Sequence, residues 1–155
     1  MLNQFSRTQI LLGEAAMAKL AAARVAVFGI GGVGGYAVET LARSGVGALD
    51  LFDDDKICVT NVNRQLHATL STVGQHKVDV AAARVLDINP NCVVTCYRMF
   101  YLPENAGEID LARYDYVIDA VDTMSAKLEL ATRCHALGVP MIACMGAGKI
   151  GRAHV

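Results

Sequence analysis

A glycine-rich turn is the first feature of this sequence that could carry chemistry. Residues 29–34 read GIGGVG, directly after the apolar run 24–28 and before a helical pattern over 36–43. Because glycine has no Cβ, such a turn lets backbone N–H groups and a helix N-terminus come close to phosphate. The turn predicts a nucleotide site whose contacts include Gly29, Gly31, Gly32 and Gly34.

A long polar loop follows the next apolar run and supplies charges suited to a triphosphate. It begins at Asp53 and contains Asp55, Asn61 and Arg64, and Lys77 opens the following helical pattern. Attack of a carboxylate oxygen on the α-phosphorus of ATP builds negative charge on the departing pyrophosphate. Fixed Arg and Lys groups stabilise that charge, and Mg²⁺ bound by carboxylates bridges the phosphates. We therefore expect ATP and Mg²⁺ as cofactors.

Part of this pattern also fits another class of enzyme. Asp53 follows Gly34 by about 20 residues, the spacing at which dinucleotide-binding folds place a ribose-binding acid. An NAD-dependent oxidoreductase therefore stays open as an alternative, and so does a non-catalytic nucleotide-binding scaffold. Arg64 and Lys77 favour adenylation, because hydride transfer has no need of two cations beside the turn.

The composition indicates one ordinary domain with a buried sheet. The 155 residues are 54% hydrophobic and 19% charged, as expected for a parallel sheet covered on both faces. A net charge of −1 gives no overall attraction to nucleic acid or to an anionic membrane. Five cysteines without a CxxC pair suggest small core residues rather than disulfides or zinc ligands. With neither a signal peptide nor an apolar span in the sequence, we expect a cytoplasmic protein and no membrane partner.

The order of the expected elements predicts an α/β, Rossmann-like fold, a mostly parallel sheet with helices on both faces. Helices are expected over 9–22, 34–44, 77–88 and 125–137, and strands over 25–30, 48–52, 92–97, 116–120 and 140–145. Ligands bind outside the carboxyl ends of such strands, where the glycine turn, Asp53 and Asp122 would meet.

The expected domain organisation has three parts. Residues 1–23 form an N-terminal helical segment, 24–150 form the ATP-binding adenylation domain, and 151–155 are a candidate for a non-native tail. Residues 146–148 read GAG and suggest a functional turn, but no further strand follows. We therefore expect the sheet to lack its C-terminal part.

Four motifs together resemble the ubiquitin-activating-type adenylating superfamily of ThiF, MoeB and HesA. They are the glycine turn with Asp53, TNVNRQ over 60–65, VGQHK over 73–77 and DAVD over 119–122. The resemblance spans about residues 7–148. The longer patterns TNxNRQxHA and DAxDTxSAK resemble the tRNA threonylcarbamoyladenosine dehydratase branch, whereas sulfur-carrier activators more often read SNxxRQ and DN.

The resemblance implies roles for individual residues. Gly31 and Gly32 would lie against the nucleotide, which Asp53 would bind at the ribose. Phosphates would be contacted by Asn61, Arg64 and Lys77, with Asp55 nearby, and Asp122 would coordinate Mg²⁺. Arg7 matches an arginine that the family contributes across a homodimer interface. The implied catalytic set is Arg7, Arg64, Lys77 and Asp122.

The resemblance also implies an activity, ATP-dependent adenylation of a carboxylate with cyclising dehydration of threonylcarbamoyladenosine in tRNA. The alternative substrate is the C-terminal glycine of a ubiquitin-like sulfur carrier, which would bring a cysteine desulfurase system as a partner.

Several side chains have a plainer interpretation. Asp122 could cap the helix that follows it, and Arg7 could be a solvated terminal residue. We expect Lys127 to be a helix-surface charge, and His67 and His76 to be polar loop residues.

Overall fold

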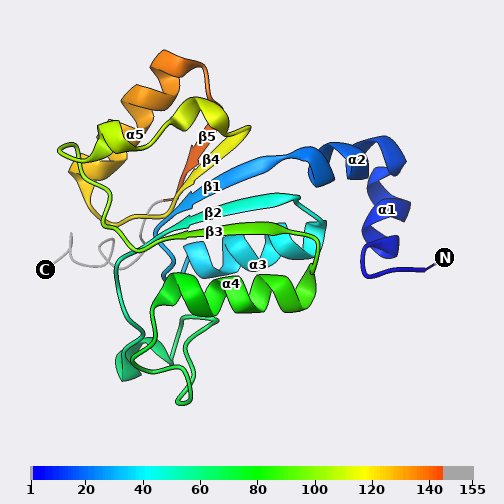
Figure 1. Ribbon diagram of the computed structural model, residues 1–155, viewed down its shortest axis with the longest axis horizontal. Helices are drawn as coiled ribbons and strands as arrows, with labels where there is room; N and C mark the ends of the chain where they lie inside the picture. Colours follow the sequence, from blue (N-terminus) through cyan, green and yellow to red (C-terminus); the bar gives the residue numbers. More distant parts are fainter. Residues whose placement is uncertain (1, 145–155) are drawn as a thin grey trace, which may run out of the picture.

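Five parallel strands form a single sheet in the computed structural model, which describes residues 2–144 (Figure 1). The strand order is β3-β2-β1-β4-β5, so the chain reverses its direction of winding between β1 and β4. This order is the Rossmann order, and it opens a crevice at the reversal. The strands are β1 (Arg24–Phe28), β2 (Ala48–Phe52), β3 (Val93–Tyr97), β4 (Tyr116–Asp119) and β5 (Met141–Ala143).

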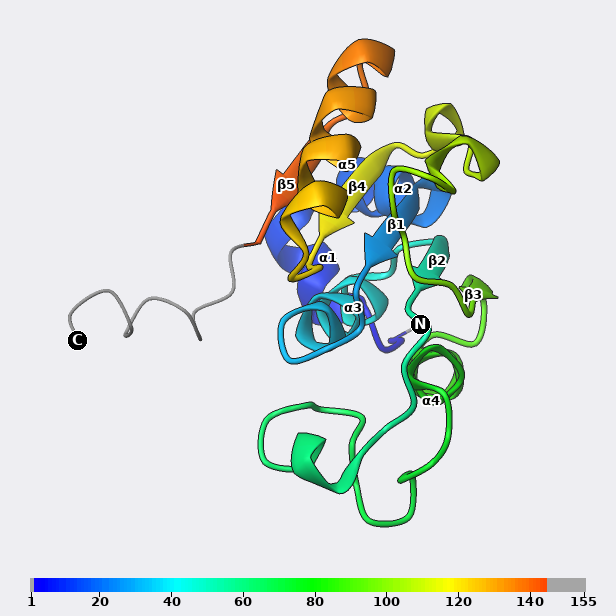
Figure 2. The same ribbon diagram turned by 90° about the vertical axis from the view of Figure 1, so that its left-hand side faces the viewer.

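Helices cover both faces of the sheet, as the sequence predicts. Figures 1 and 2 show α3 and α4 against one face and α5 against the other, with α1 and α2 near the amino ends of the strands. The helices are α1 (Ser6–Leu12), α2 (Glu14–Ala22), α3 (Gly34–Ser44), α4 (Lys77–Ile88) and α5 (Met124–Leu137). Short 3₁₀ turns lie at η1 (Val59–Asn61), η2 (Ala106–Glu108) and η3 (Leu111–Arg113).

Two hydrophobic cores follow from the alternation of side chains along each strand. Val25 and Val27 of β1 pack in the core under α3 and α4, whereas Ala26 and Phe28 pack in the core under α5. Because both faces are buried, the strands appear in the sequence as continuous apolar runs.

The N-terminal helical segment is the largest departure from the predicted elements. The single helix predicted over 9–22 is wrong: it begins earlier, at Ser6, and is broken at Gly13 into α1 and α2. Gly13 has φ of 84°, a left-handed conformation that interrupts an α-helix and that glycine adopts without strain. The predicted 146–148 turn and the 151–155 tail lie outside the described residues.

Candidate functional site

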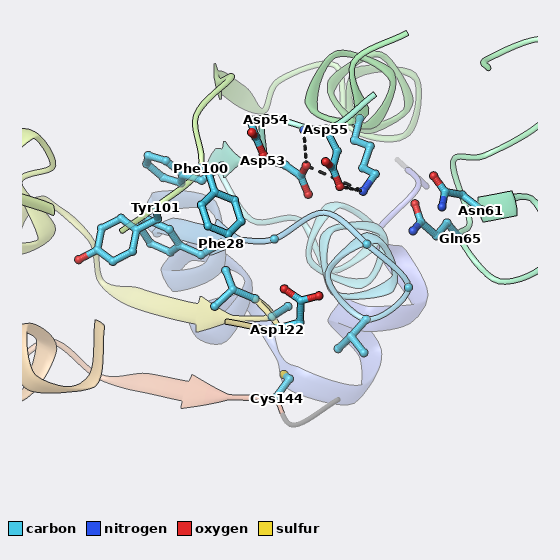
Figure 3. A pocket seen from close by; sticks show the side chains of 18 of the residues that line it. Phe28, Asp53, Asp54, Asp55, Asn61, Gln65, Phe100, Tyr101, Asp122 and Cys144 are labelled. Carbon is cyan, nitrogen blue, oxygen red and sulfur yellow. Dashed lines mark hydrogen bonds and ion pairs between the residues drawn. The ribbon is translucent and has the colours of Figure 1, made fainter. Parts of the chain in front are cut away.

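A cavity of about 610 Å³ lies at the carboxyl edge of the sheet, where β1, β2 and β4 end (Figure 3). This cavity lies in the crevice that the strand order opens between β1 and β4. The sequence-predicted residues that line it are Gly29, Gly31, Gly32, Asp53, Asp55, Asn61, Arg64, Lys77 and Asp122. Two predicted residues do not line it, Gly34 and Arg7.

The glycine turn is shaped by close backbone approaches. Gly29 has φ of 85°, and a Cβ there would lie 2.7 Å from the carbonyl oxygen of Ala120. At Gly31 and Gly32, which line the cavity, the nearest atoms to a Cβ are 3.8–3.9 Å away, so these two positions are not crowded by the protein itself. A Cβ on Gly34 would lie 1.7 Å from the Gly29 carbonyl oxygen. Gly34 therefore permits helix α3 to pack on the turn, and the side of the turn at Gly31 and Gly32 faces the cavity.

Asp53 joins the ends of β1 and β2. Its Oδ2 accepts a hydrogen bond from the N–H of Ile30 at 2.7 Å, and its Oδ1 accepts one from the N–H of Asp55 at 2.9 Å. Burial raises the pKa of Asp53, while the Ile30 N–H and the charge of Lys77 act in the opposite direction. The backbone N–H bonds fix this carboxylate at the cavity wall.

Lys77 begins α4 and brings a buried ammonium group to the same wall. Its Nζ lies 2.5 Å from Asp55 Oδ2 and 4.0 Å from Asp53 Oδ1, and its side chain is 7% exposed. The N–H of Lys77 also donates to the Asp55 carbonyl oxygen at 3.1 Å. Asp55 is exposed, so this ion pair lies at the surface of the cavity.

Carboxylates at this edge form a donor set that suits Mg²⁺, a cation that prefers oxygen ligands. Ligand atoms of Asp53, Asp54 and Asp55 lie within 4.8 Å of one another. Asp122 lies across the cavity (Figure 3) and is exposed; the hydroxyl of Thr123 donates to its Oδ1 at 3.5 Å. Thr123 is the N-cap of α5 and makes no side-chain cap bond, and within residues 2–144 the carboxylate of Asp122 accepts from the Thr123 hydroxyl rather than from an N–H of this helix. The capping interpretation of Asp122 is therefore wrong.

The loop around η1 carries Asn61 and Arg64. Asn61 Oδ1 accepts from the N–H of Cys58 at 2.9 Å, which holds the turn together. Arg64 is exposed, and its Nη1 donates to the Thr60 carbonyl oxygen at 2.9 Å. Its Cγ lies 3.8 Å from where a Cβ of Gly32 would be. The same Nη1 donates to Asn63 Oδ1 at 3.0 Å, so the stem of the Arg64 side chain passes the glycine turn while Nη1 bonds within its own loop.

An aromatic wall on the other side of the cavity was missed by the sequence analysis. The ring of Phe52 stacks on those of Phe28 and Tyr97, with centroids 4.2 and 4.3 Å apart. Tyr101 meets Phe28 edge to face at 4.9 Å, and Phe100 is 40% exposed at the cavity. The apolar string after β3, YRMFY over 97–101, is the signal that could have revealed it. The cavity therefore has one charged side and one apolar side.

Lys127 is not the surface charge that the sequence suggested. Its side chain is 7% exposed, its Nζ lies 3.0 Å from Asp119 Oδ2, and it donates to the Cys144 carbonyl oxygen at 2.8 Å. The N–H of Cys144 donates in turn to the Asp119 carbonyl oxygen at 2.7 Å. The prediction was wrong because the first turns of α5 lie against the ends of β4 and β5.

His67 is also more buried than a polar loop residue. It is 4% exposed, and a Cβ on Gly35 would lie 3.0 Å from its Nδ1, so the ring packs on the start of α3. Burial lowers the pKa of His67 to about 4, and the charges of Lys77 and Arg84 act in the same direction. His76 begins α4 as its N-cap without a side-chain cap bond.

Arg7 lies away from the cavity. It is exposed on α1, near the amino ends of the strands, whereas the cavity lies at their carboxyl ends (Figure 1). Arg7 therefore cannot serve the cavity of its own chain. Among the described residues, no helix is long and apolar enough to cross a membrane.

Comparisons with known proteins agree with this geometry. The ThiF family model matches residues 5–155. The chain is 50% identical over 149 residues to a Bacillus subtilis tRNA threonylcarbamoyladenosine dehydratase, covering 96% of this chain and 59% of the relative. It is 34% identical to the Escherichia coli sulfur carrier protein ThiS adenylyltransferase, covering 98% of this chain and 61% of the relative.

A solved structure extends the likeness to three dimensions. The Escherichia coli tRNA threonylcarbamoyladenosine dehydratase in complex with ATP superposes with a TM-score of 0.91 at 44% identity, over 94% of this chain and 60% of the other. The chain spans about three fifths of the length of these relatives. The match of the ThiF family model to residues 5–155 shows that the chain belongs to the ThiF family.

Proposed function

We propose that this protein activates a carboxylate by adenylation with ATP. The observation that carries the proposal is the pairing of Lys77 with Asp55 at 2.5 Å in a cavity that also holds Arg64 and the glycine turn. Two fixed cations beside a phosphate-binding turn suit charge that develops on a pyrophosphate leaving group. The ATP complex of a 44% identical relative supports the same choice of nucleotide.

Each residue of the cavity has a task in this reaction. Gly31 and Gly32 admit the phosphates close to the backbone, and Asp53 binds the ribose hydroxyls. A carboxylate oxygen of the substrate attacks the α-phosphorus, and the bond to pyrophosphate breaks. Arg64 and Lys77 hold the departing charge, so the protein contributes position and electrostatic stabilisation without a general base.

Magnesium fits the oxygen donors on the charged side of the cavity. Asp122 and the cluster of Asp53, Asp54 and Asp55 offer carboxylates on two sides of the cavity. When bound, Mg²⁺ neutralises phosphate charge as a Lewis acid. We assign Asp122, which makes no ion pair among residues 2–144, as the protein ligand; Asp54 of the cluster, which also makes none, is the alternative.

The proposed substrate is the threonylcarbamoyl group on an adenosine of tRNA. Relatives at 44–50% identity bear the name of that dehydratase. The adenylated carboxyl would be attacked within the same molecule, which closes a ring with net loss of water and release of AMP. An alternative substrate, the C-terminal glycine of a sulfur carrier, is supported by the 34% likeness to a ThiS adenylyltransferase. A cysteine desulfurase would then be a partner.

A homodimer completes the proposed site. Arg7 is exposed on α1. The side chains of Ile10 and Leu11 on the same helix are each 84% exposed, so α1 presents an apolar surface to water. A second copy covering this surface could bring its Arg7 to the cavity of the first. A cytoplasmic location remains a prediction from the sequence.

Calorimetric titration of the protein with MgATP and with NAD tests the nucleotide. We expect MgATP to bind more tightly, and tighter binding of NAD would reject adenylation in favour of hydride transfer. Copurification separates the substrates: bound tRNA supports the dehydratase, and a small protein ending in Gly-Gly supports the sulfur-carrier alternative.

A further inference from the structure

Gln65 brings a buried polar group without a partner to the wall of the cavity. The residue is 6% exposed, and its Oε1 has no hydrogen-bond partner among the described residues. An unpaired buried acceptor destabilises a folded protein, so native structures leave few of them. A bound ligand that satisfies the carboxamide would explain why the sequence keeps it there.

Backbone hydrogen bonds hold the main chain of Gln65 at the edge of the cavity. The N–H of Gln65 donates to the Asn61 carbonyl oxygen at 2.9 Å, and the Gln65 carbonyl oxygen accepts from the N–H of Ala68 at 3.0 Å. Its Nε2 lies 3.9 Å from where a Cβ of Gly31 would be. The side chain therefore reaches the glycine turn at Gly31, which lines the cavity.

The surroundings show which part of a nucleotide would meet it. Figure 3 shows Gln65 beside Asn61, on the far side of the cavity from Phe100 and Tyr101. The side chain of the neighbouring Arg64 passes Gly32: its Cγ lies 3.8 Å from the position that a Cβ of Gly32 would occupy. A carboxamide beside the glycine turn can donate from Nε2 to a phosphate oxygen and accept at Oε1 from ordered water.

We propose that Gln65 is a phosphate-binding residue: its Nε2 donates to a phosphate oxygen when a nucleotide polyphosphate occupies the cavity, and a water ordered by that ligand donates to its Oε1. This inference rests on the proposed nucleotide site. Two consequences separate it from a structural role. Loss of the carboxamide weakens binding of ATP without weakening that of adenosine, and it leaves the ligand-free protein at least as stable as before.

Gln65→Met is the first test, because methionine keeps the length of the side chain and removes its polar atoms. We expect the dissociation constant for ATP to rise about tenfold or more, the loss of one hydrogen bond to a charged group. The dissociation constant for adenosine stays within about twofold, and the melting temperature of the ligand-free variant equals or exceeds that of the wild type. Gln75→Met is the matched control, since Gln75 is exposed in the same loop and its Nε2 bonds only the Ser71 carbonyl oxygen.

Gln65→Glu provides a second test that does not depend on packing. It keeps the shape and places a carboxylate beside the phosphates, so ATP binding falls further than in Gln65→Met while adenosine binding is retained. Unchanged ATP binding in Gln65→Met overturns the role of Gln65 alone. Equal loss of ATP and adenosine with a lower melting temperature makes the residue structural. Failure of the wild type to bind ATP overturns the proposed function itself.

Discussion

Lys127 and Asp119 form a buried ion pair, with 3.0 Å between Nζ and Oδ2 and exposures of 7% and 0% for the two side chains. The pair ties the first turns of α5 to the end of β4, and the bond from Lys127 to the Cys144 carbonyl oxygen adds the end of β5. Asp119 Oδ1 also accepts from the N–H of Val121 at 3.1 Å. The segment that carries Asp122 into the cavity is therefore anchored from both ends.

Breaking this pair should destabilise the fold strongly. Lys127→Met leaves the Asp119 carboxylate buried without its partner, which costs about 3–5 kcal/mol of unfolding free energy. Urea unfolding followed by circular dichroism measures the loss. Lys19→Met is the control, because Lys19 is exposed on α2 and its loss should stay within about 0.5 kcal/mol. A small effect at Lys127 would show that water or rearrangement satisfies Asp119.

Arg64→Ala should slow adenylation while leaving the fold intact. The exposed guanidinium contributes little to stability, but as a phosphate contact it stabilises the transition state by about 2–4 kcal/mol. We expect ATP–pyrophosphate exchange to fall by about 30- to 1,000-fold. Arg43→Ala removes an exposed i,i+4 pair with Glu39 and should leave exchange unchanged. Normal exchange in Arg64→Ala would place this arginine on the solvated surface.

Asp122→Asn tests whether the carboxylate of Asp122 is a ligand of Mg²⁺. If Asp122 binds Mg²⁺, the variant binds MgATP much more weakly but binds ATP in EDTA as the wild type does. Calorimetric titration under both conditions gives the comparison, with Asp87→Asn on exposed α4 surface as the control. If Asp54→Asn shows the metal-dependent loss instead, the acidic cluster holds the cation and Asp122 does not.

His67 should make the stability of the protein depend on pH. Its pKa is lowered in the folded state from 6.5 to about 4, so between these values the unfolded chain binds more protons. Stability is therefore fully present above pH 6.5 and falls as the pH drops toward 4, by at most about 1.4 kcal/mol per pH unit. In His67→Gln the unfolding free energy should no longer fall in this way between pH 6.5 and pH 4, which unfolding measurements across that range would show. His135→Gln, on the exposed surface of α5, should retain it. A wild-type slope in His67→Gln would assign the dependence to other groups.

The sequence was sufficient for the parts of the site that depend on local structure. Apolar runs ended by glycine or Asp53 locate the strand ends, and parallel strands bring those ends to one edge. The partners of Lys127 could not be predicted, because they depend on α5 packing against β4 and β5. The surroundings of His67 could not be predicted either, because they depend on its loop folding back on α3. The aromatic wall likewise depends on rings from β1, β2 and the segment after β3 meeting in space.

Subunit mixing tests the proposed role of Arg7 across a dimer. Arg7→Ala and Arg64→Ala homodimers should each be impaired at both sites. In a heterodimer, one site carries both defects and the other carries neither, so an equal mixture should recover about a quarter of wild-type exchange activity. Arg64→Ala mixed with Lys77→Ala is the control. Both residues line the cavity of their own chain, so every heterodimer site stays defective and no activity returns. A monomer in sedimentation equilibrium, or no recovery between subunits that demonstrably exchange, would remove Arg7 from the site.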